Sequence, residues 1–200
     1  MKMRRKRFRL WETAALLALS LCLCAEAWAQ GRQADISGAL VRLHVLAASD
    51  AAEEQALKLR VRDAVLDYLR PALAEAESAE EAKTILRQDL DGIARAAAGA
   101  AEGRTVRVSL SREAYPTRAY EGFTLPAGCY DSLRVVLGEG EGHNWWCVVF
   151  PPLCLSAAEA EPMQSVMSPG GFALVCEGEG CTLRFKTVEL WGKITGRFAK

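Results

Sequence analysis

The segment 138–154, GEGEGHNWWCVVFPPLC, is the most individual stretch of the chain and indicates how its sheet is built. Its glycine-rich beginning predicts a turn, and Trp145 to Phe150 then predicts a strand that Pro151-Pro152 ends. Because side chains on a strand alternate between its two faces, one of Trp145 and Trp146 faces the core and the other faces outward. The outward tryptophan either lies beneath a loop or contacts a partner.

Further strands and two helices are expected on either side of this segment. Alternating apolar and polar residues predict strands over residues 39–46, 105–111, 131–137 and 183–190. Between the first two strands, apolar residues at helical spacing predict two helices. The first begins at Asp50, whose side chain is expected to cap it, and ends at Pro71. The second begins with Ser78 as its cap and ends near Gly99.

This order of elements predicts an α+β fold, because the helices come early and most of the strands follow them. We expect two helices packed on one face of a mostly antiparallel sheet, in a single domain over residues 38–191. Residues 155–181 are poor in pattern and are expected to be an insertion or a variable segment within that domain.

The first 29 residues have the organisation of a signal peptide. Basic residues at positions 2–9 precede an apolar run from Thr13 to Ala25, and Ala27-Trp28-Ala29 offers small residues to a signal peptidase. The run of 13 residues is shorter than the ~20 that span a bilayer core, which favours cleavage after Ala29 over a retained anchor. We therefore expect an exported, extracytoplasmic protein.

Export changes how the charge is interpreted. The whole chain has 25 basic and 25 acidic residues, but six basic and two acidic ones lie in the first 29 residues. The remaining 171 residues carry 19 Lys and Arg against 23 Asp and Glu, a net charge of −4. Such a domain has no electrostatic reason to bind nucleic acid. The glycines at 138–142 follow a strand but precede no helix, so a phosphate-binding loop is not indicated, and no cofactor or small-molecule substrate is expected.

Five cysteines remain after the signal, and in an oxidising compartment they are expected to pair. Cys147 and Cys154 are separated by six residues that include a Pro-Pro turn, which makes them candidates for one disulfide. Cys176 and Cys181 flank a flexible glycine-rich loop and are candidates for a second. Separately buried thiols are the alternative, and Cys129 is interpreted as a buried small hydrophobic residue.

The two histidines are candidates for catalytic or metal-binding groups, but the sequence favours neither role. His143 and Asn144 precede Cys147 closely and are residue types of a thiol hydrolase, but such groups normally come from distant segments. A zinc site is disfavoured because the histidines lie about a hundred residues apart and no Cys-x-x-Cys occurs. His44 in its apolar strand is interpreted as a hydrogen-bonded structural residue, and Asp50 as a structural helix cap. No catalytic, metal or cofactor residue is assigned.

Three stretches of the chain resemble the stage II sporulation protein R family. They are LVRLHVLAASDAAEEQALKLRVRDAVLDYL at 40–69, YPTRAYEGFTLPAGCYDSLRVVLGEGEGHNWWCVVFPPLC at 115–154 and LRFKTVELW at 183–191. Cys129, residues 155–180 and the Cys176/Cys181 pair depart from the family pattern. The combination of HVLAASD with NWWC and FPPLC is far more specific than a generic motif.

The resemblance implies a signalling protein of endospore formation and not an enzyme. Members are made in the forespore and exported into the space between the two membranes, where they trigger a membrane-embedded aspartic protease of the mother cell. That protease then processes the precursor of sigma-E. Membrane contact is expected only through this receptor or an uncleaved signal. His143, Asn144, Trp145 and Trp146 are the candidate contacts with the receptor. An exported cysteine hydrolase of the cell wall with Cys147 as nucleophile, and an anchored structural envelope protein, are the alternatives.

Overall fold

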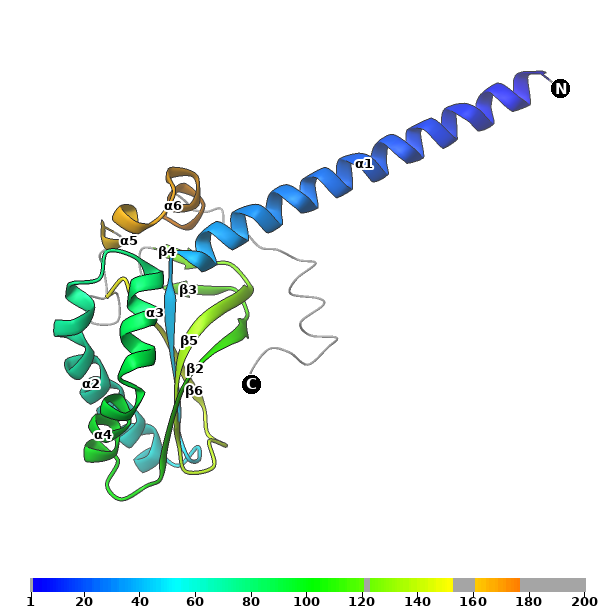
Figure 1. Ribbon diagram of the computed structural model, residues 1–200. Helices are drawn as coiled ribbons and strands as arrows, with labels where there is room; N and C mark the ends of the chain where they lie inside the picture. Colours follow the sequence, from blue (N-terminus) through cyan, green and yellow to red (C-terminus); the bar gives the residue numbers. More distant parts are fainter. Residues whose placement is uncertain (1, 121–122, 153–160, 177–200) are drawn as a thin grey trace. The chain divides into compact units, whose positions relative to one another are not determined.

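A computed structural model describes residues 2–120, 123–152 and 161–176 (Figure 1). The chain divides into two units, residues 1–34 and residues 35–200. The N-terminal unit consists of helix α1 (Lys2–Gly38), whose last turn belongs to the second unit. The second unit holds the sheet and the remaining helices, and each unit is described by itself.

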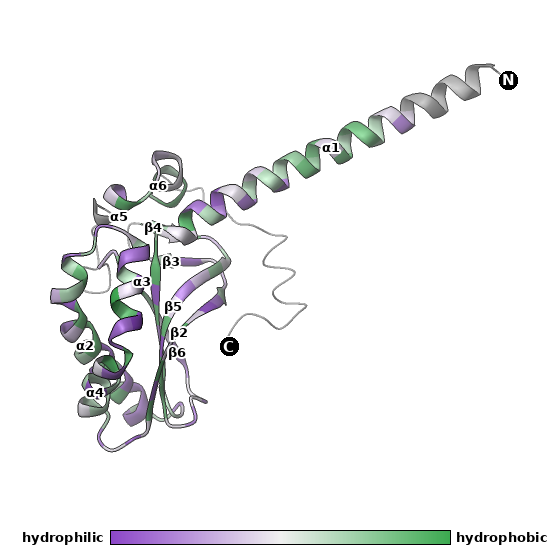
Figure 2. Ribbon diagram, in the orientation of Figure 1, coloured by the Kyte–Doolittle hydropathy of each residue, from purple (hydrophilic) through white to green (hydrophobic). Residues whose placement is uncertain are grey.

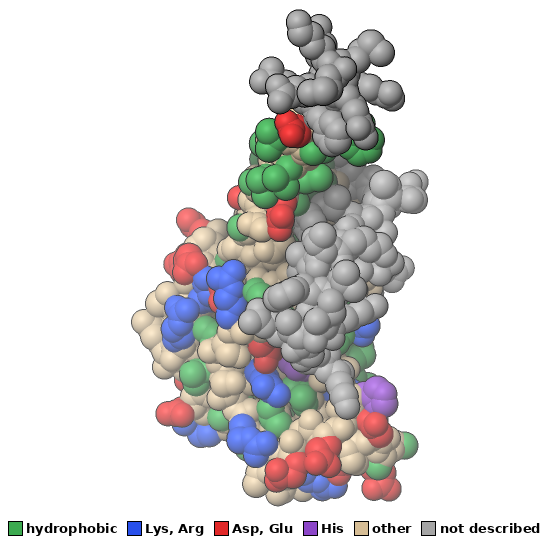
Figure 3. All heavy atoms as spheres, turned by 90° about the vertical axis from the view of Figure 1, so that its right-hand side faces the viewer, with side chains coloured by type: hydrophobic (Ala, Val, Ile, Leu, Met, Phe, Trp, Pro, Cys, Tyr) green, Lys and Arg blue, Asp and Glu red, His purple; other side chains and the backbone are tan. Residues whose placement is uncertain are grey.

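The N-terminal helix is apolar over much of its length. Figure 2 shows the hydrophobic colour concentrated in the middle of α1, and Figure 3 shows apolar side chains gathered around its described part. Its portion Trp11–Gly38, 28 residues long, has the length and composition to cross a membrane. A signal sequence near the N-terminus has the same properties, so the helix is compatible with either a signal or an anchor.

The sheet of the second unit has four strands in the order β2-β5-β1-β6. They are β2 (Val106–Tyr115), β5 (Gly128–Leu137), β1 (Val41–Leu46) and β6 (Asn144–Phe150). β1 runs parallel to β5, and the other two pairings are antiparallel. A separate hairpin is formed by β3 (Arg118–Tyr120) and β4 (Phe123–Leu125), between β2 and β5 in the sequence. The predicted α+β class and the mostly antiparallel sheet are confirmed.

Three helices cover one face of this sheet in Figure 1: α2 (Ala52–Ala74), α3 (Ala79–Gln88) and α4 (Leu90–Ala100). Their apolar stripes meet alternate residues of the strands, as amphipathic helices on a sheet should. The resulting core is built from apolar side chains, and its best buried members include Val41, Leu43, Val45, Val61, Val65, Leu86, Ile93, Leu133 and Val135.

The helix boundaries differ from the prediction in two places. Pro71 does not end the first helix but lies in the last turn of α2, which continues to Ala74. The second predicted helix is broken at Asp89, whose side chain accepts a hydrogen bond from the N–H of Gly92 and so caps α4. The cap predicted at Ser78 is confirmed, because its Oγ accepts from the N–H of Glu81 at 3.3 Å.

The opposite face of the sheet has a second, smaller cluster. It is built from the end of α1, the β3–β4 hairpin and two short helices, α5 (Glu161–Val166) and α6 (Pro169–Cys176). Its buried members are Ile36, Leu40, Tyr115, Leu125, Tyr130, Val148, Met167 and Val175. The described part of the expected insertion is therefore helical and packs on the domain. The strand predicted over 183–190 lies outside the described residues.

Candidate functional site: a polar network across the sheet

The face opposite the three helices carries a chain of hydrogen bonds with a contribution from every strand. On β1, His44 places Nδ1 2.9 Å from Oε2 of Glu113 on β2, and Nε2 2.8 Å from Oδ1 of Asn144 on β6. On β2, the hydroxyl of Tyr115 donates to Glu113 at 3.3 Å and lies 2.6 Å from Oγ of Ser132 on β5. The network therefore joins β2, β5, β1 and β6 side by side.

Strand register explains why these residues meet. His44 pairs with Arg134 of β5 and with Trp146 of β6, so all three side chains lie on one face of the sheet. His44 is 1% exposed, and Ser132 is fully buried. The structural, hydrogen-bonded role predicted for His44 agrees with this geometry. A buried polar network of this kind stabilises a fold when each member has a partner.

Glu113 is the anionic member of the network. Burial would raise the pKa of its carboxyl, but the hydrogen bond and charge of His44, with Arg134 nearby, lower that pKa below its ordinary value. Burial raises the pKa of Tyr115, so its hydroxyl keeps its proton at physiological pH. The carboxylate is thus ionised and the phenol neutral, as their donor and acceptor roles require.

Arg42 lies beside this network on β1 and is fully buried. Its guanidinium lies 3.9 Å from the ring centroid of Tyr115 and 5.1 Å from that of Tyr130, and it donates to the hydroxyl of Tyr120. Aromatic faces attract a cation, most strongly away from water. Nε and Nη1 have no hydrogen-bond partner among the described residues, so the tyrosine rings are the main described support for this charge.

The two tryptophans of β6 lie on opposite faces, as alternation along a strand predicts. Trp146 faces the network, with its ring centroid 5.9 Å from that of His44 and 5.7 Å from that of Tyr115. Trp145 lies on the helix side at the edge of the sheet and is 37% exposed. The guanidinium of Arg62 on α2 lies 4.5 Å from the centre of its ring. Trp145 is therefore the outward tryptophan.

The HVLAASD motif at 44–50 and the loop that precedes NWWC, residues 138–143, meet at one end of the sheet. The N–H groups of Glu141 and Gly142 donate to the carbonyls of Ala48 and Ala47, at 3.3 and 3.0 Å. Gly142 is required at this close approach, because a Cβ there would lie 2.3 Å from the carbonyl oxygen of Ser49. The loop between β5 and β6, residues 138–143, is thereby docked on the loop between β1 and α2.

Side chains fasten the same pair of loops. Asp50 accepts from the backbone N–H of His143 at 2.6 Å and also contacts Nδ1 of its ring. The hydrogen bond with the His143 ring lowers the pKa of the Asp50 carboxyl, and burial opposes that shift. The capping role predicted for Asp50 is wrong: α2 has Ala51 at its N-cap position, without a side-chain cap. The carboxylate binds the neighbouring loop instead.

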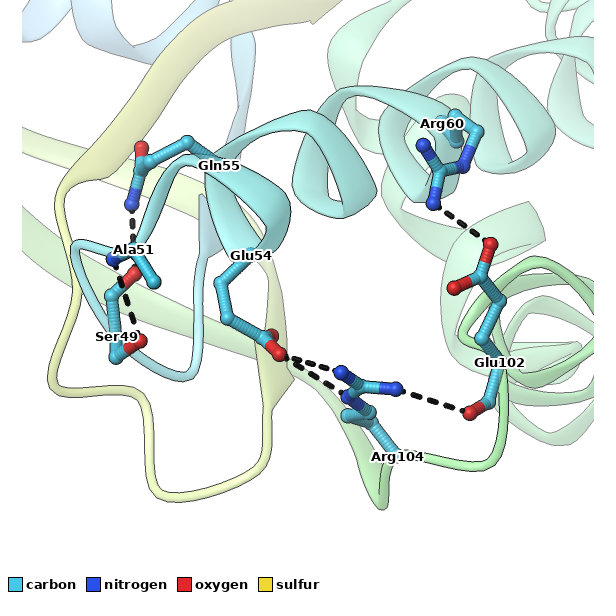
Figure 4. Close-up of polar contacts among 7 residues, drawn as sticks. All are labelled: Ser49, Ala51, Glu54, Gln55, Arg60, Glu102 and Arg104. Carbon is cyan, nitrogen blue, oxygen red and sulfur yellow. Dashed lines mark hydrogen bonds and ion pairs between the residues drawn. The ribbon is translucent and has the colours of Figure 1, made fainter.

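The start of α2 supports this arrangement. Lys58 is 4% exposed and donates to the carbonyl of His143 at 2.9 Å. Burial lowers its pKa, although the Asp50 carboxylate opposes that shift. Figure 4 shows Gln55 donating to the carbonyl of Ser49 at 2.8 Å, and Arg104 bonding Glu54 at 2.7 Å. The first turns of α2 are thus tied both to the loop that precedes them and to the segment that leads into β2.

The structure tests only some of the predictions for the cysteines, because two of the five lie outside the described residues. Cys147 lies on β6, but Cys154 and Cys181 are outside the described residues, so both pairings stay predictions. Cys176 is the last residue of α6. Cys129 is exposed rather than buried, because its position on β5 points away from the neighbouring buried residues Gly128 and Tyr130. The interpretation of Cys129 as a buried hydrophobic residue is wrong.

Sequence reasoning misses most of the network. It does not single out Glu113, Tyr115, Ser132 or Arg42, and it expects Asn144 to contact a partner rather than His44. One signal is present: Arg42 and His44 stand two apart in an otherwise apolar strand and so share a face. In the part of the chain that the structure describes, no group of three or more His, Cys, Asp or Glu side chains is placed to hold a metal ion.

Fold and site together define a small α+β domain that follows an apolar N-terminal helix. The sequence model of the family described as Stage II sporulation protein R matches residues 37–160, more than half of the chain. The chain belongs to this family, and both docked loops fall within the match. The family is named for sporulation and is not an enzyme family by name.

A curated relative gives the same result. Stage II sporulation protein R of Bacillus subtilis (strain 168) is 37% identical to this chain over 118 residues. The alignment covers 57% of this chain and 53% of the relative, so the chain spans about half the length of the relative that it matches. No solved structure matches the chain.

Proposed function

We propose that the protein is an exported signal of endospore formation that triggers a membrane-embedded aspartic protease of the mother cell. In this proposal the activated protease processes the sigma-E precursor. Membership of the Stage II sporulation protein R family carries the proposal, because the family match includes both docked loops and the strand that bears the tryptophans. The protein acts as a ligand and performs no chemistry of its own.

Export from the forespore is the second part of the proposal. The apolar helix Trp11–Gly38, preceded by basic residues, supports entry into a secretion pathway. Cleavage after Ala29 releases residues 30–200 into the space between the two membranes. Described acidic and basic side chains are interspersed on the surface seen in Figure 3, which suits a protein that recognises a protein partner rather than nucleic acid.

The receptor contact is proposed to centre on Trp145. In the second unit, Trp145 and Tyr68 are the large apolar side chains described as exposed, and the Tyr68 hydroxyl is bound to Asp89. Tryptophan and arginine are enriched among residues that dominate binding energy. Arg62 packs on one face of the Trp145 ring and is itself bonded to Asp63 at 2.7 Å. The Trp145 side chain is therefore already ordered before binding, which lowers the conformational entropy lost when a partner binds.

The other candidate contacts divide according to their surroundings. The His143 side chain is 78% exposed and lies two residues before Trp145 in the chain, so we assign it to the proposed contact surface. Asn144 and Trp146 face the polar network and are removed from that surface. Activation requires that this surface bind the active arrangement of the receptor better than the inactive one.

Reconstitution in a bacterial host without sporulation genes tests the proposal. The host expresses the candidate protease and the sigma-E precursor, with or without this protein, and precursor cleavage is scored by immunoblot. We expect cleavage only when the protein is present and exported. A variant lacking residues 2–29 serves as the matched control, because it stays inside the cell and should not activate. An exported, folded protein that leaves the precursor uncut would contradict the proposal.

A further inference from the structure

Helix α2 supports the exposed tryptophan and the loop that precedes it. Lys58 of this helix donates to the carbonyl of His143 at 2.9 Å. Four residues further along, the guanidinium of Arg62 lies 4.5 Å from the centre of the Trp145 ring. Residues four apart lie on the same side of a helix, so one side of α2 contacts both the loop and the ring. The position of Trp145 relative to the loop is therefore set by a single rigid element.

The basic groups next to Trp145 are covered, whereas the acidic groups face solvent. Lys58 is buried, and the side chain of Arg62 is 19% exposed. The side chain of Asp63, which pairs with Arg62, is 51% exposed, and that of Asp50 at the docked loop is 57% exposed. A partner that approaches Trp145 therefore meets negative charge near the ring.

The loop between β5 and β6 adds two more carboxylates, those of Glu139 and Glu141, and both residues are exposed. Together with Asp50 and Asp63 they form what we call the acidic rim. Glu141 precedes Trp145 by four residues, so the two Cα atoms lie at most about 14 Å apart. A protein–protein interface of standard size covers about 800 Å² on each partner and is thus about 30 Å across. An interface centred on Trp145 therefore includes part of the acidic rim.

We propose that the receptor presents to Trp145 an apolar pocket flanked by lysine or arginine side chains. The ring fills the pocket at the centre of the interface, where the residues that dominate binding energy lie, and the acidic rim meets the basic side chains at its edge. Complementary charges at such an edge speed association and disfavour wrong partners. This inference rests on the proposed function, because it describes the receptor side of the same contact.

The same charges disfavour two other occupants of this surface. A second copy of the chain would bring one acidic rim against another, and like charges that face each other across an interface weaken binding. A membrane surface rich in anionic lipids attracts basic residues and repels acidic ones. A protein with a basic edge around an apolar pocket is the partner that fits both the exposed ring and the charges around it.

Reversal of charge in the acidic rim tests this inference in the reconstituted host. Glu139→Lys/Glu141→Lys replaces two exposed carboxylates, while backbone groups and Asp50 still dock the loop. Expression is graded, and immunoblots give the amount of exported, protease-resistant protein needed for half-maximal cleavage of the precursor. We expect that amount to rise at least about tenfold, because like charges then face each other across the interface. Glu139→Gln/Glu141→Gln removes the charges without reversing them and should raise the amount by less.

Glu75→Lys/Glu77→Lys is the matched control. It changes the net charge of the chain by the same amount, and both residues are exposed. Glu75 follows the last residue of α2 and lies about 25 Å from Lys58 along the helix. Charges this far apart are screened at physiological ionic strength, so the amount of protein needed should stay within about twofold of that for the unmodified protein.

Three results would overturn the inference and leave the proposed function in place. They are an unchanged requirement for Glu139→Lys/Glu141→Lys, an equal rise in the control, and a lower requirement, which would indicate an acidic partner surface. If the lysine variant does not fold, the glutamine variant alone decides, and an unchanged requirement there overturns the inference. Absence of cleavage with the unmodified, exported protein would contradict the proposed function itself, and this inference with it.

Discussion

The two faces of the sheet are buried by different means. On the helix side, Val41, Leu43 and Val45 of β1 pack against α2, α3 and α4 in an apolar core. On the other side, Arg42 and His44 of the same strand are as well buried, but by tyrosines, a carboxylate and an amide. The free energy that apolar burial contributes to folding depends on the area and packing of the side chains and hardly on pH. The free energy that a polar network contributes depends also on which of its groups are protonated. Strand β1 therefore contributes to one face whose stability hardly varies with pH and to another whose stability depends on pH.

The largest expected effect is on the apolar side. Leu133 is fully buried in the middle of β5, and Leu133→Ala removes apolar contacts and leaves a cavity. We expect the free energy of unfolding to fall by about 2–5 kcal/mol, by the same amount at about pH 5.5 and about pH 8. Urea denaturation of the variant and of the unmodified protein at the two pH values measures this difference in the free energy of unfolding. A loss that changes with pH would contradict the division between the faces.

Glu113→Gln tests the polar side with an intermediate effect. Because the pKa of this carboxyl is lowered on folding, its contribution is present above the ordinary value of 4.5 and is lost as the pH falls through the folded-state value. We expect Glu113→Gln to cost about 1.5–3 kcal/mol near pH 6, the range for a hydrogen bond to a charged group.

The variant should also lose stability less steeply than the unmodified protein between about pH 5 and about pH 3. Acid titration followed by circular dichroism compares the two slopes. Equal slopes would show that Glu113 has no special role in acid unfolding, and that the two faces respond to acid alike.

Gly142→Ala tests the contact between the two loops. The added Cβ would lie 2.3 Å from the carbonyl oxygen of Ser49, so the loops must separate or the backbone must shift. We expect a loss of about 1–3 kcal/mol, the usual cost of inserting a methyl group into a packed site. Gly99→Ala is the matched control, because a Cβ added at this position of α4 would meet nothing within 4 Å. There we expect a gain of at most about 0.5–1 kcal/mol, since Gly99 lies in the last turn of α4 and alanine favours the helical conformation over glycine.

The same contrast between the faces explains how far the sequence predicts the structure. The apolar stripes of α2 to α4 and the alternation in β1, β5 and β6 are sufficient for the α+β class and for most boundaries, because periodicity reflects burial against one apolar surface. The buried polar side is not predictable from alternation, since a polar residue on a strand ordinarily indicates a solvated face. Arg42 and His44 are buried only because β2, β6 and the β3–β4 hairpin supply partners far away in the sequence.

The local errors have a similar origin. Asp50 has the sequence position of a helix cap, but His143, 93 residues away, provides a stronger partner for its carboxylate. Asp89 is preceded and followed by helical residues, and its carboxylate both caps α4 and accepts from the Tyr68 hydroxyl at 2.6 Å. In both places a short acidic side chain can bond either a nearby backbone N–H or a residue distant in the sequence. The local sequence does not show which distant residues the fold brings near.

The central claim, that the outward tryptophan meets a receptor, is tested most directly by replacing the two tryptophans one at a time. Trp145→Ala and Trp146→Ala are compared in the reconstituted host for precursor cleavage, and as purified proteins for the free energy of unfolding. We predict that Trp145→Ala folds and is exported normally but abolishes cleavage. Trp146→Ala instead should lose about 3 kcal/mol of stability or more, because its ring packs against His44 and Tyr115. Normal cleavage with folded, exported Trp145→Ala would contradict the account.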